Sequence, residues 1–303
     1  MRIKTVKLKT FRIVLLFHLF ASVSPVFSQE TGSPFEYFQR VIFLNVTVNE
    51  TDHLLFLFDT GTNVSVIDEQ TLEKLDLPFT RTAMVERNGA MKKVAMVEAE
   101  ELLAANVSVS NMELAVENLG NIPAPEGRHI DGILGTDFLK DFVVEIDFKK
   151  QKLSFSTKSK CTSGFIPFAM INNIPQIKVT INDTVHTYLR YDSGSSLFET
   201  ENTFGNATTE ICIALQLTDS TLRPVSYFSG AHAGGRVKLA AVPVRTFFFV
   251  GQKVKYPFIF VQPRQGYFAS TDVIGFFGNN LFEKFGRVNI DFPGQKICFP
   301  GKE

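Results

Sequence analysis

The sequence has no tryptophan, only three cysteines among its 303 residues and no excess of charge of either sign. Lys and Arg together number 31, and so do Asp and Glu. A protein that binds nucleic acid needs a strongly basic face, so this balance argues against a nucleic-acid partner. Hydrophobic residues make up 45% of the chain, which excludes a disordered or collagen-like protein. At roughly 100–200 residues per domain, the length predicts two domains.

The sequence patterns of several common enzyme sites are absent. No Gly-x-Ser-x-Gly occurs, which argues against a serine hydrolase with a nucleophile elbow. The chain also has no His-Glu-x-x-His, no P-loop and no Gly-x-Gly-x-x-Gly. Cys161, Cys212 and Cys298 lack the close spacing of a metal site, and three cysteines leave at least one unpaired. We therefore expect structural thiols, no metal and no cofactor.

The first 28 residues predict a cleaved signal peptide. Five basic residues precede the apolar run from Val14 to Ala21, and no acidic residue occurs before Glu30. That run is too short to span a bilayer and no later apolar stretch is long enough, so we expect no stable membrane insertion. In Val26-Phe27-Ser28, small residues stand at the two positions that a signal peptidase inspects, which predicts cleavage after Ser28. We expect a secreted or periplasmic protein.

A repeat divides the remaining chain into two related halves. The segment 46–53 followed by Asp59-Thr60-Gly61-Thr62 recurs without a gap as 179–186 followed by Asp192-Ser193-Gly194-Ser195. Farther along, Gly132-Ile133-Leu134-Gly135 corresponds to Gly275-Phe276-Phe277-Gly278, and each copy leads into a similar hairpin. Two copies indicate two related lobes rather than a solenoid. We place these lobes at 35–157 and 163–300, with a polar link between them.

The local pattern predicts an all-β fold with few short helices. Segments 41–48 and 174–181 are rich in β-branched residues and end at Asn49 and Asn182, as strands before turns do. Segment 53–58 is apolar on both faces, which favours a buried central strand. Short helices are expected at 68–75, with Asp68 as the cap, and after each downstream glycine motif. We interpret His53 and His186, which are equivalent in the repeat, as hairpin residues rather than metal ligands.

Each Asp-[Thr/Ser]-Gly-[Thr/Ser] motif follows an apolar strand. A single copy would be typical of a surface turn, but two copies in aligned repeats indicate a shared function. With Ile133-Leu134-Gly135 and Phe276-Phe277-Gly278 downstream, the chain resembles the aspartic peptidase superfamily, both pepsin-like and retropepsin-like, and specifically its bacterial single-chain, bilobal members. The resemblance covers nearly all of the chain after the predicted signal peptide.

The resemblance implies a bilobal acid-protease fold, with two β-barrel-like lobes related by a pseudo-two-fold axis. It also implies that Asp59 and Asp192 form a catalytic pair that shares a proton and activates a water molecule to hydrolyse a peptide bond. We therefore expect an aspartic endopeptidase that acts, at acidic pH, on a peptide or unfolded protein, and that is a monomer.

The same resemblance assigns supporting roles to the rest of each motif. Gly61 and Gly194 allow a tight turn that brings amides toward the carboxylates. The hydroxyls of Thr60 and Ser193 interlock beneath the pair. Those of Thr62 and Ser195 can hydrogen-bond the outer carboxylate oxygens, which favours the charged form and hence an acidic optimum.

Two glycine-containing segments are candidate flaps that would cover a bound peptide. Asn88-Gly89 has the signature of a tight hairpin turn. The second half has a glycine-rich segment from Tyr227 to Gly235, which includes Gly230. One flap in each half would resemble a retropepsin dimer fused into one chain, although the first lacks the tyrosine of pepsin-like flaps. Both segments can also be interpreted as ordinary surface loops.

Two other functions are compatible with the sequence. The chain could keep the fold but serve as a catalytically silent module that binds extended peptides. It could also process one dedicated partner and leave generic substrates uncut. Because both aspartates are present, the sequence favours the active endopeptidase.

Overall fold

The computed structural model describes most of the chain after the predicted signal peptide. The described residues are 32–87, 90–159, 161–195, 203–217, 226–232, 235–249, 252–254, 258–264, 268 and 274–300. The predicted signal peptide and its cleavage site after Ser28 lie outside them. Among the described residues, no helix is long and apolar enough to cross a membrane.

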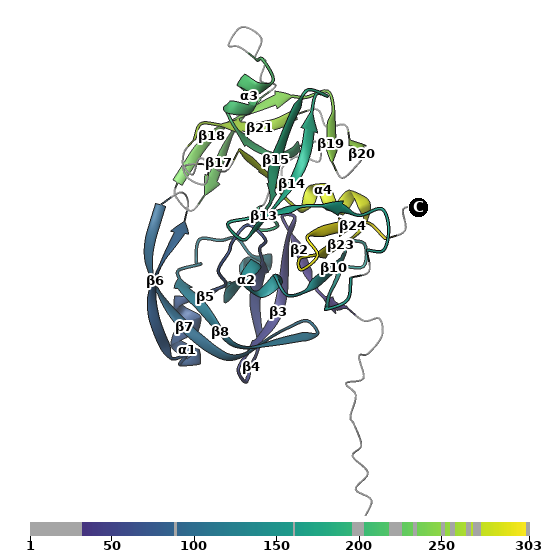
Figure 1. Ribbon diagram of the computed structural model, residues 1–303. Helices are drawn as coiled ribbons and strands as arrows, with labels where there is room; N and C mark the ends of the chain where they lie inside the picture. The colour runs from purple at the N-terminus through teal and green to yellow at the C-terminus, as the bar shows by residue number, and fades with distance from the viewer. Residues whose placement is uncertain are drawn as a thin grey trace, which may run out of the picture. The chain divides into compact units, whose positions relative to one another are not determined.

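The first half of the repeat forms an eight-stranded sheet (Figure 1). Its strand order is β2 (Glu36–Phe38), β3 (Val41–Val48), β4 (Thr51–Phe58), β9 (Gly132–Leu134), β5 (Val66–Asp68), β8 (Val107–Glu117), β7 (Ala90–Ala104) and β6 (Phe79–Arg87). The apolar end of β4 lies between β3 and β9 and is buried, which confirms the expected central strand.

The second half builds an equivalent ten-stranded sheet from its own copy of the repeat. Its main order is β17 (Ser226–His232), β18 (Gly235–Pro243), β21 (Phe258–Gln262), β16 (Thr203–Thr208), β22 (Gly275–Phe277), β15 (Val185–Tyr191), β14 (Ile174–Ile181), β19 (Phe247–Phe249) and β20 (Gln252–Val254), and β13 (Ala169–Ile171) also pairs with β14. The pairs β3–β4 and β14–β15 correspond, as do the parallel pairs β4–β9 and β15–β22. The two strands rich in β-branched residues end where the sequence predicts.

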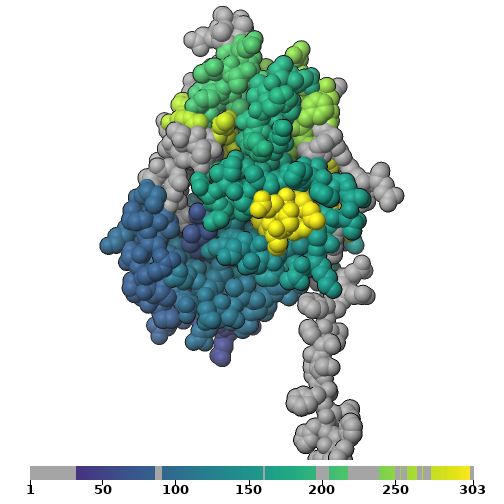
Figure 2. Space-filling view, viewed as in Figure 1, coloured from purple at the N-terminus to yellow at the C-terminus, as the bar shows by residue number. Residues whose placement is uncertain are grey.

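The third sheet contains strands from both halves. Its order is β1 (Ser33–Pro34), β11 (Lys152–Ser156), β10 (Val143–Asp147), β23 (Arg287–Asp291), β24 (Lys296–Cys298) and β12 (Ile166–Pro167). Glu145 and Asn289, which are equivalent in the repeat, pair directly across the antiparallel strands β10 and β23. Pairing of equivalent residues places a local pseudo-two-fold axis at this point. In Figure 2 the C-terminal residues, in yellow, reach the surface among teal residues from the middle of the chain.

Few short helices interrupt the strands, which confirms the all-β prediction. The described helices are α1 (Glu69–Leu75), α2 (Thr136–Leu139), α3 (Glu210–Ala214) and α4 (Asn279–Phe282), with 3-10 turns η1 (Pro125–Gly127) and η3 (Glu283–Phe285). Asp68 caps α1 by accepting a hydrogen bond from the Gln70 N–H, as expected. The helices α2 and α4 follow Gly135 and Gly278, also as expected.

One hydrophobic core runs through both halves. Phe58 and Phe138 from the first half and Tyr191, Phe277 and Phe282 from the second belong to the same buried cluster. Tyr191, Phe277 and Phe282 pack against one another as stacked or edge-on rings. Many of the 31 phenylalanines therefore serve packing, because aromatic side chains bury large areas at low entropic cost.

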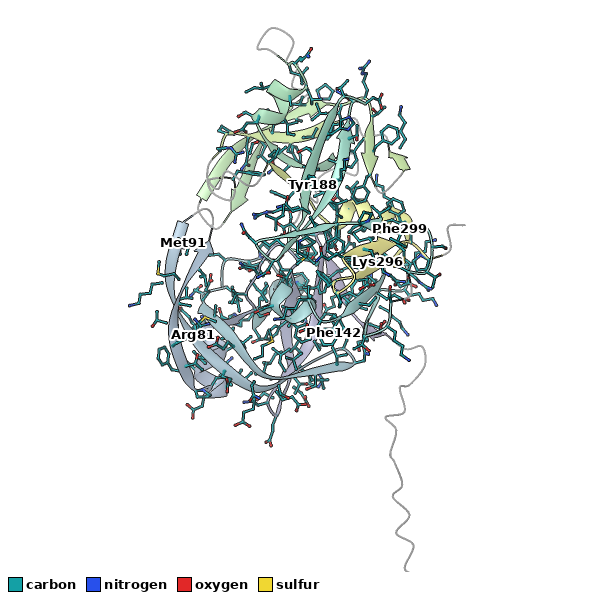
Figure 3. All side chains as sticks on the ribbon, in the orientation of Figure 1. Arg81, Met91, Phe142, Tyr188, Lys296 and Phe299 are labelled. Carbon is teal, nitrogen blue, oxygen red and sulfur yellow. A yellow bond between two sulfur atoms is a disulfide. The ribbon has the colours of Figure 1, made fainter. Side chains whose placement is uncertain are left out.

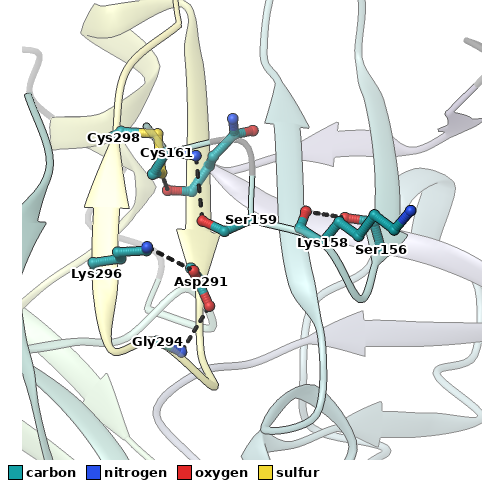
Figure 4. Close-up of a disulfide and its surroundings, with 9 residues drawn as sticks. Ser156, Lys158, Ser159, Cys161, Asp291, Gly294, Lys296 and Cys298 are labelled. Carbon is teal, nitrogen blue, oxygen red and sulfur yellow. Dashed lines mark hydrogen bonds and ion pairs between the residues drawn. A yellow bond between two sulfur atoms is a disulfide. The ribbon is translucent and has the colours of Figure 1, made fainter. Parts of the chain in front are cut away.

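A disulfide joins Cys161 to Cys298 (Figure 4). It ties the start of the second half to β24 in the shared sheet, and both cysteines are buried. Cys212 is buried in α3 and is unpaired. One bridge and one free thiol agree with the sequence prediction that at least one cysteine stays unpaired.

Candidate active site

Asp59 and Asp192 stand at equivalent positions, directly after the central strands β4 and β15. The Asp59 N–H donates to the carbonyl of Leu134 at 3.0 Å, and the Asp192 N–H donates to the carbonyl of Phe277 at 3.0 Å. Leu134 and Phe277 end the parallel neighbours β9 and β22. The same backbone arrangement therefore positions an aspartate in each half.

Thr60 and Ser193 join the two aspartate loops through four buried hydrogen bonds. The Thr60 N–H donates to Ser193 Oγ at 2.9 Å, and the Ser193 N–H donates to Thr60 Oγ1 at 3.0 Å. Thr60 Oγ1 then donates to the carbonyl of Tyr191 at 2.7 Å, and Ser193 Oγ donates to that of Phe58 at 2.9 Å. Both side chains are fully buried. Each hydroxyl thus links the opposite loop to the strand that precedes it.

The glycines bring each loop against the carboxylate of the other. A Cβ at Gly61 would lie 2.5 Å from Asp192 Cγ, and a Cβ at Gly194 would lie 2.6 Å from Asp59 Cγ. No larger residue fits without displacing a carboxylate. The Gly61 N–H also donates to Asp59 Oδ1 at 2.7 Å. Asp59 and Asp192 therefore meet where the two loops meet.

Thr62 and Ser195, the last residues of the motifs, contribute to the geometry of their own loops. Thr62 Oγ1 donates to the carbonyl of Val64 at 3.3 Å, and the Ser195 N–H donates to the carbonyl of Asp192 at 3.2 Å. The carbonyl of Thr62 accepts from the Thr136 N–H at 2.9 Å. This last bond connects the first aspartate loop to the downstream glycine motif.

Ser65 and Asp137 form a support in the first half that sequence reasoning missed. The N–H and Oγ of Ser65 donate to the two carboxylate oxygens of Asp137, at 2.8 and 2.6 Å. Ser65 Oγ in turn accepts from the Gly135 N–H at 2.9 Å. Burial raises the pKa of Asp137, and the bonds from Ser65 partly oppose that rise. The available signal was an acidic residue two positions after the motif glycine, where the second half has Asn280.

Tyr191 and Asn279 form a different support in the second half. Tyr191 Oη donates to Asn279 Oδ1 at 2.7 Å, and Asn279 Nδ2 donates to the carbonyl of Ser193 at 3.1 Å. Burial raises the pKa of Tyr191 well above its usual value, and the charges of Asp192 and Asp59 raise it further against the effect of Ser193. Tyr191 therefore stays protonated and donates. Sequence reasoning missed this pair because Phe58, the residue equivalent to Tyr191, has no hydroxyl.

Both candidate flap segments belong to β-hairpins. Strands β6 and β7 pair up to Arg87 and Ala90, so Asn88 and Gly89 connect them, but these two residues lie outside the described ones. On these two strands Met84 and Met91 have exposed side chains, and Met91 can be seen in Figure 3. In β17 the backbones of Tyr227 and Gly230 pair with Ala240 and Val237 of β18. Nothing is described of the Tyr227 side chain.

The arrangement suits acid–base chemistry by two carboxylates. Asp59 is half-buried and Asp192 is 8% exposed, so each carboxylate is largely withdrawn from bulk water. Two carboxyl groups that lie close together can share one proton, and such a pair would supply a base and an acid at one place. Across the described ranges, no three His, Cys, Asp or Glu side chains gather as metal ligands would.

Comparison with known proteins gives a family match for part of the chain. Residues 44–138 match the aspartyl protease family, a stretch that includes Asp59 and Gly135 but not Asp192. A retropepsin-like aspartic protease from Rickettsia conorii is 21% identical over 34% of this chain and 72% of its own, with a TM-score of 0.25. Basic 7S globulin from soybean is 8% identical over 88% of this chain and 93% of its own, with a TM-score of 0.45. No curated protein matches the chain significantly. The family match supports an aspartic-peptidase-like protein.

Proposed function

We propose that this protein is an aspartic endopeptidase in which Asp59 and Asp192 together activate a water molecule. The observation that carries the proposal is the reciprocal contact in which Gly61 lies against the Asp192 carboxylate and Gly194 lies against that of Asp59. Two carboxylates that lie close together repel each other, which destabilises the folded protein unless the pair holds one proton between them. Such a pair is typical of a site that uses this proton in catalysis. The family match over residues 44–138 supports the same chemistry.

The mechanism requires one carboxylate and one carboxylic acid. The carboxylate removes a proton from water as the oxygen attacks the carbonyl carbon of the peptide bond, and the acid donates its proton to the carbonyl oxygen. The resulting tetrahedral diol collapses when a proton is transferred to the leaving nitrogen, and the carbon–nitrogen bond breaks. The interlocked Thr60 and Ser193 hold the two carboxyl groups in place, so the reaction needs little reorganisation.

An acidic optimum follows from the shared proton, because the pair must be singly protonated to act. Bonds that favour the charged form, such as the one from the Gly61 N–H to Asp59, move this range to lower pH. We expect activity to fall at neutral pH, because the pair then loses the one proton that it shares.

Residues 1–28 are proposed to direct export and to be removed after Ser28. The Cys161–Cys298 disulfide supports this, because such bonds persist mainly in oxidising compartments. Expression of the full chain, followed by N-terminal sequencing of the exported fraction, tests the proposal. Gln29 is the expected first residue, and an intact N-terminus found only inside the cell would contradict it.

The decisive test measures cleavage of an unfolded protein between about pH 3 and pH 7 by four forms of the enzyme. Wild type should cut at acidic pH and be inhibited by a statine-type transition-state mimic, whereas Asp59→Asn and Asp192→Asn should lose at least about 1,000-fold in rate. Asp141→Asn is the matched control, since Asp141 is exposed and lies outside both motifs. Unchanged cleavage in either motif variant would reject the proposed pair.

The same assay separates the endopeptidase from a silent binding module and from a dedicated processing enzyme. Tight binding of peptides by the wild type without turnover at any pH would identify the module. Clean cutting of one natural partner, with no cleavage of generic substrates, would identify the processing enzyme. Both outcomes are distinct from a folded protein that neither binds nor cuts.

A further inference from the structure

One face of the first sheet carries a row of six apolar side chains. The strand registers align them across neighbouring strands in the order Phe43, Leu57, Ile133, Val66, Ala115 and Met96. They belong to a buried or partly buried cluster that includes Ala83 and Val94, from the candidate flap strands β6 and β7. This face is therefore the one on the side of the β6–β7 hairpin.

The equivalent row in the second sheet is polar at three of its six positions. Its order is Gln176, Arg190, Phe276, Asn206, Phe260 and Ala241. Gln176 and Arg190 occupy the positions that Phe43 and Leu57 hold in the first sheet, and they pair directly across β14 and β15. Gln176 is 4% exposed, and Arg190 and Asn206 are each 7% exposed. In the second half, a cationic side chain and two amide side chains therefore occupy positions where the first half has apolar side chains.

Among the described residues, part of this polar row has no hydrogen-bond partner. In the described part of the chain, Gln176 Nε2 and Asn206 Oδ1 have no hydrogen-bond partner, although Asn206 Nδ2 donates to Gln262 Oε1 at 3.3 Å. Buried polar atoms without partners destabilise a fold, so such atoms call for a functional explanation. A ligand that accepts from Gln176 would provide one.

The polar row begins beside the proposed catalytic pair. Arg190 precedes Asp192 by two residues, which is about 6.6 Å along a strand. Tyr191, between them, points into the central core, so Arg190 points to the opposite face, as does the exposed Tyr188 (Figure 3). On that face Phe276 belongs to one buried cluster with Leu239 and Ala241 of β18. Arg190, in β15, therefore lies close along the chain to Asp192, which directly follows that strand.

We propose that Arg190 and Gln176 form a substrate subsite that binds a carboxylate next to the scissile bond. The inference rests on the endopeptidase function proposed above and adds its substrate class. A guanidinium has five N–H donors and binds a carboxylate through two parallel hydrogen bonds, so it can do so alongside contacts that it already makes. Gln176 Nε2 adds a further donor. The carboxylate is that of an Asp or Glu side chain or that of a peptide C-terminus.

Pairs of quenched fluorescent peptides test the subsite in the full protein. One set of three peptides differs only in the residue on one side of the scissile bond, which is Glu, Gln or Leu, and a second set varies the residue on the other side in the same way. A further pair of peptides ends just beyond the scissile bond, one in a free carboxylate and the other in an amide. At about pH 5, where the Glu side chain is mostly ionised, wild type should cleave the Glu peptide about 10–100 times faster than the Gln peptide on the Asp192 side only, the range expected for charge-assisted hydrogen bonds. Preference confined to the free terminus would identify an enzyme that trims chain ends.

Variants then assign the preference to Arg190. Arg190→Leu, which introduces the residue that the first half has at the equivalent position, should abolish the Glu preference, so that the Glu and Gln peptides are cleaved at equal rates. Gln176→Phe introduces the residue type that the first half has at the equivalent position, Phe43, and should reduce the Glu preference in part. Arg245→Leu is the matched control, because Arg245 is exposed in the same half. If Arg190→Leu does not fold, Gln176→Phe and the wild-type peptide pairs still decide.

The outcomes separate the subsite from the endopeptidase. Equal cleavage of the Glu, Gln and terminal pairs by wild type would overturn the subsite and leave the endopeptidase intact. If no peptide is cleaved, the endopeptidase fails, and fluorescence anisotropy with the same peptides then tests the subsite. Binding that needs the carboxylate and disappears in Arg190→Leu would support it, whereas equal binding of Glu and Gln peptides would refute it.

Discussion

The interlock between Thr60 and Ser193 provides a sharp test of how the two halves hold each other. Thr60→Val keeps the branched shape of the side chain and replaces the hydroxyl by a methyl group. It removes the bond from Thr60 Oγ1 to the Tyr191 carbonyl and the one from the Ser193 N–H to Thr60 Oγ1. The bond from the Thr60 N–H to Ser193 Oγ can remain.

The expected loss follows from burial. Thr60 and Ser193 have no exposed surface, so water could not replace the lost hydroxyl. The Ser193 N–H and one lone pair of the Tyr191 carbonyl would then have no hydrogen-bond partner. Leaving a buried donor or acceptor unsatisfied costs about 1–3 kcal/mol. The carbonyl has a second lone pair and loses less, so we expect a total loss of about 2–4 kcal/mol in the free energy of unfolding. That is a large fraction of the 5–15 kcal/mol typical of folded proteins.

Urea unfolding followed by fluorescence or circular dichroism measures this loss. Thr82→Val is the matched control, because Thr82 is exposed in strand β6 and the same change there should shift stability by less than about 0.5 kcal/mol. A Thr60→Val protein as stable as the Thr82→Val control would refute the reasoning. A double-mutant cycle with Ser193→Ala should show strong coupling, since the two hydroxyls share one network.

Two further predictions concern the disulfide and Asp137. Because the disulfide joins residues 137 apart, reductant should lower the free energy of unfolding of wild type and of Cys212→Ala by about 3–5 kcal/mol. It should not change that of the double variant Cys161→Ala/Cys298→Ala, which has no disulfide. An equal response in all three proteins would contradict the prediction. Burial raises the pKa of Asp137 in the folded state, so its contribution to stability should fall as pH rises from the ordinary Asp value of about 3.9 through the raised one. As the pH rises from about 4 to 7, the free energy of unfolding of Asp137→Asn, measured in urea, should fall less than that of wild type or of the control Asp141→Asn. Parallel pH profiles for the three proteins would contradict this prediction.

Much of the strand and helix pattern could be predicted because local chemistry decides it. The β-branched segments 41–48 and 174–181 form β3 and β14 with the expected bounds, since alternating burial and turn residues at Asn49 and Asn182 leave few alternatives. Asp68 caps α1 because a carboxylate at that position satisfies a free N–H of the first turn. The repeat predicted two related lobes, and its two copies form equivalent strand pairs, β3–β4 with β14–β15 and β4–β9 with β15–β22, because similar sequences favour similar local structure.

The partners of individual side chains could not be predicted, because they depend on which segments meet in space. Tyr191 and Asn279 are 88 residues apart, and Ser65 and Asp137 are 72 apart. Nothing next to Tyr191 in the sequence indicates Asn279 as its partner, and the acidic residue after the first glycine motif does not by itself identify Ser65. The same holds for the pairing of Cys161 with Cys298 and for the shared sheet in which β10 meets β23.

The sequence by itself determined the duplication, the all-β character and the pair of Asp-Thr-Gly and Asp-Ser-Gly turns, since each rests on local pattern. Only the tertiary structure decided that Gly61 lies against Asp192 and Gly194 against Asp59, and that Arg190 and Gln176 are buried in one row beside that contact. Strand register and the packing of one half on the other bring these residues together, and both depend on contacts between residues far apart in the chain.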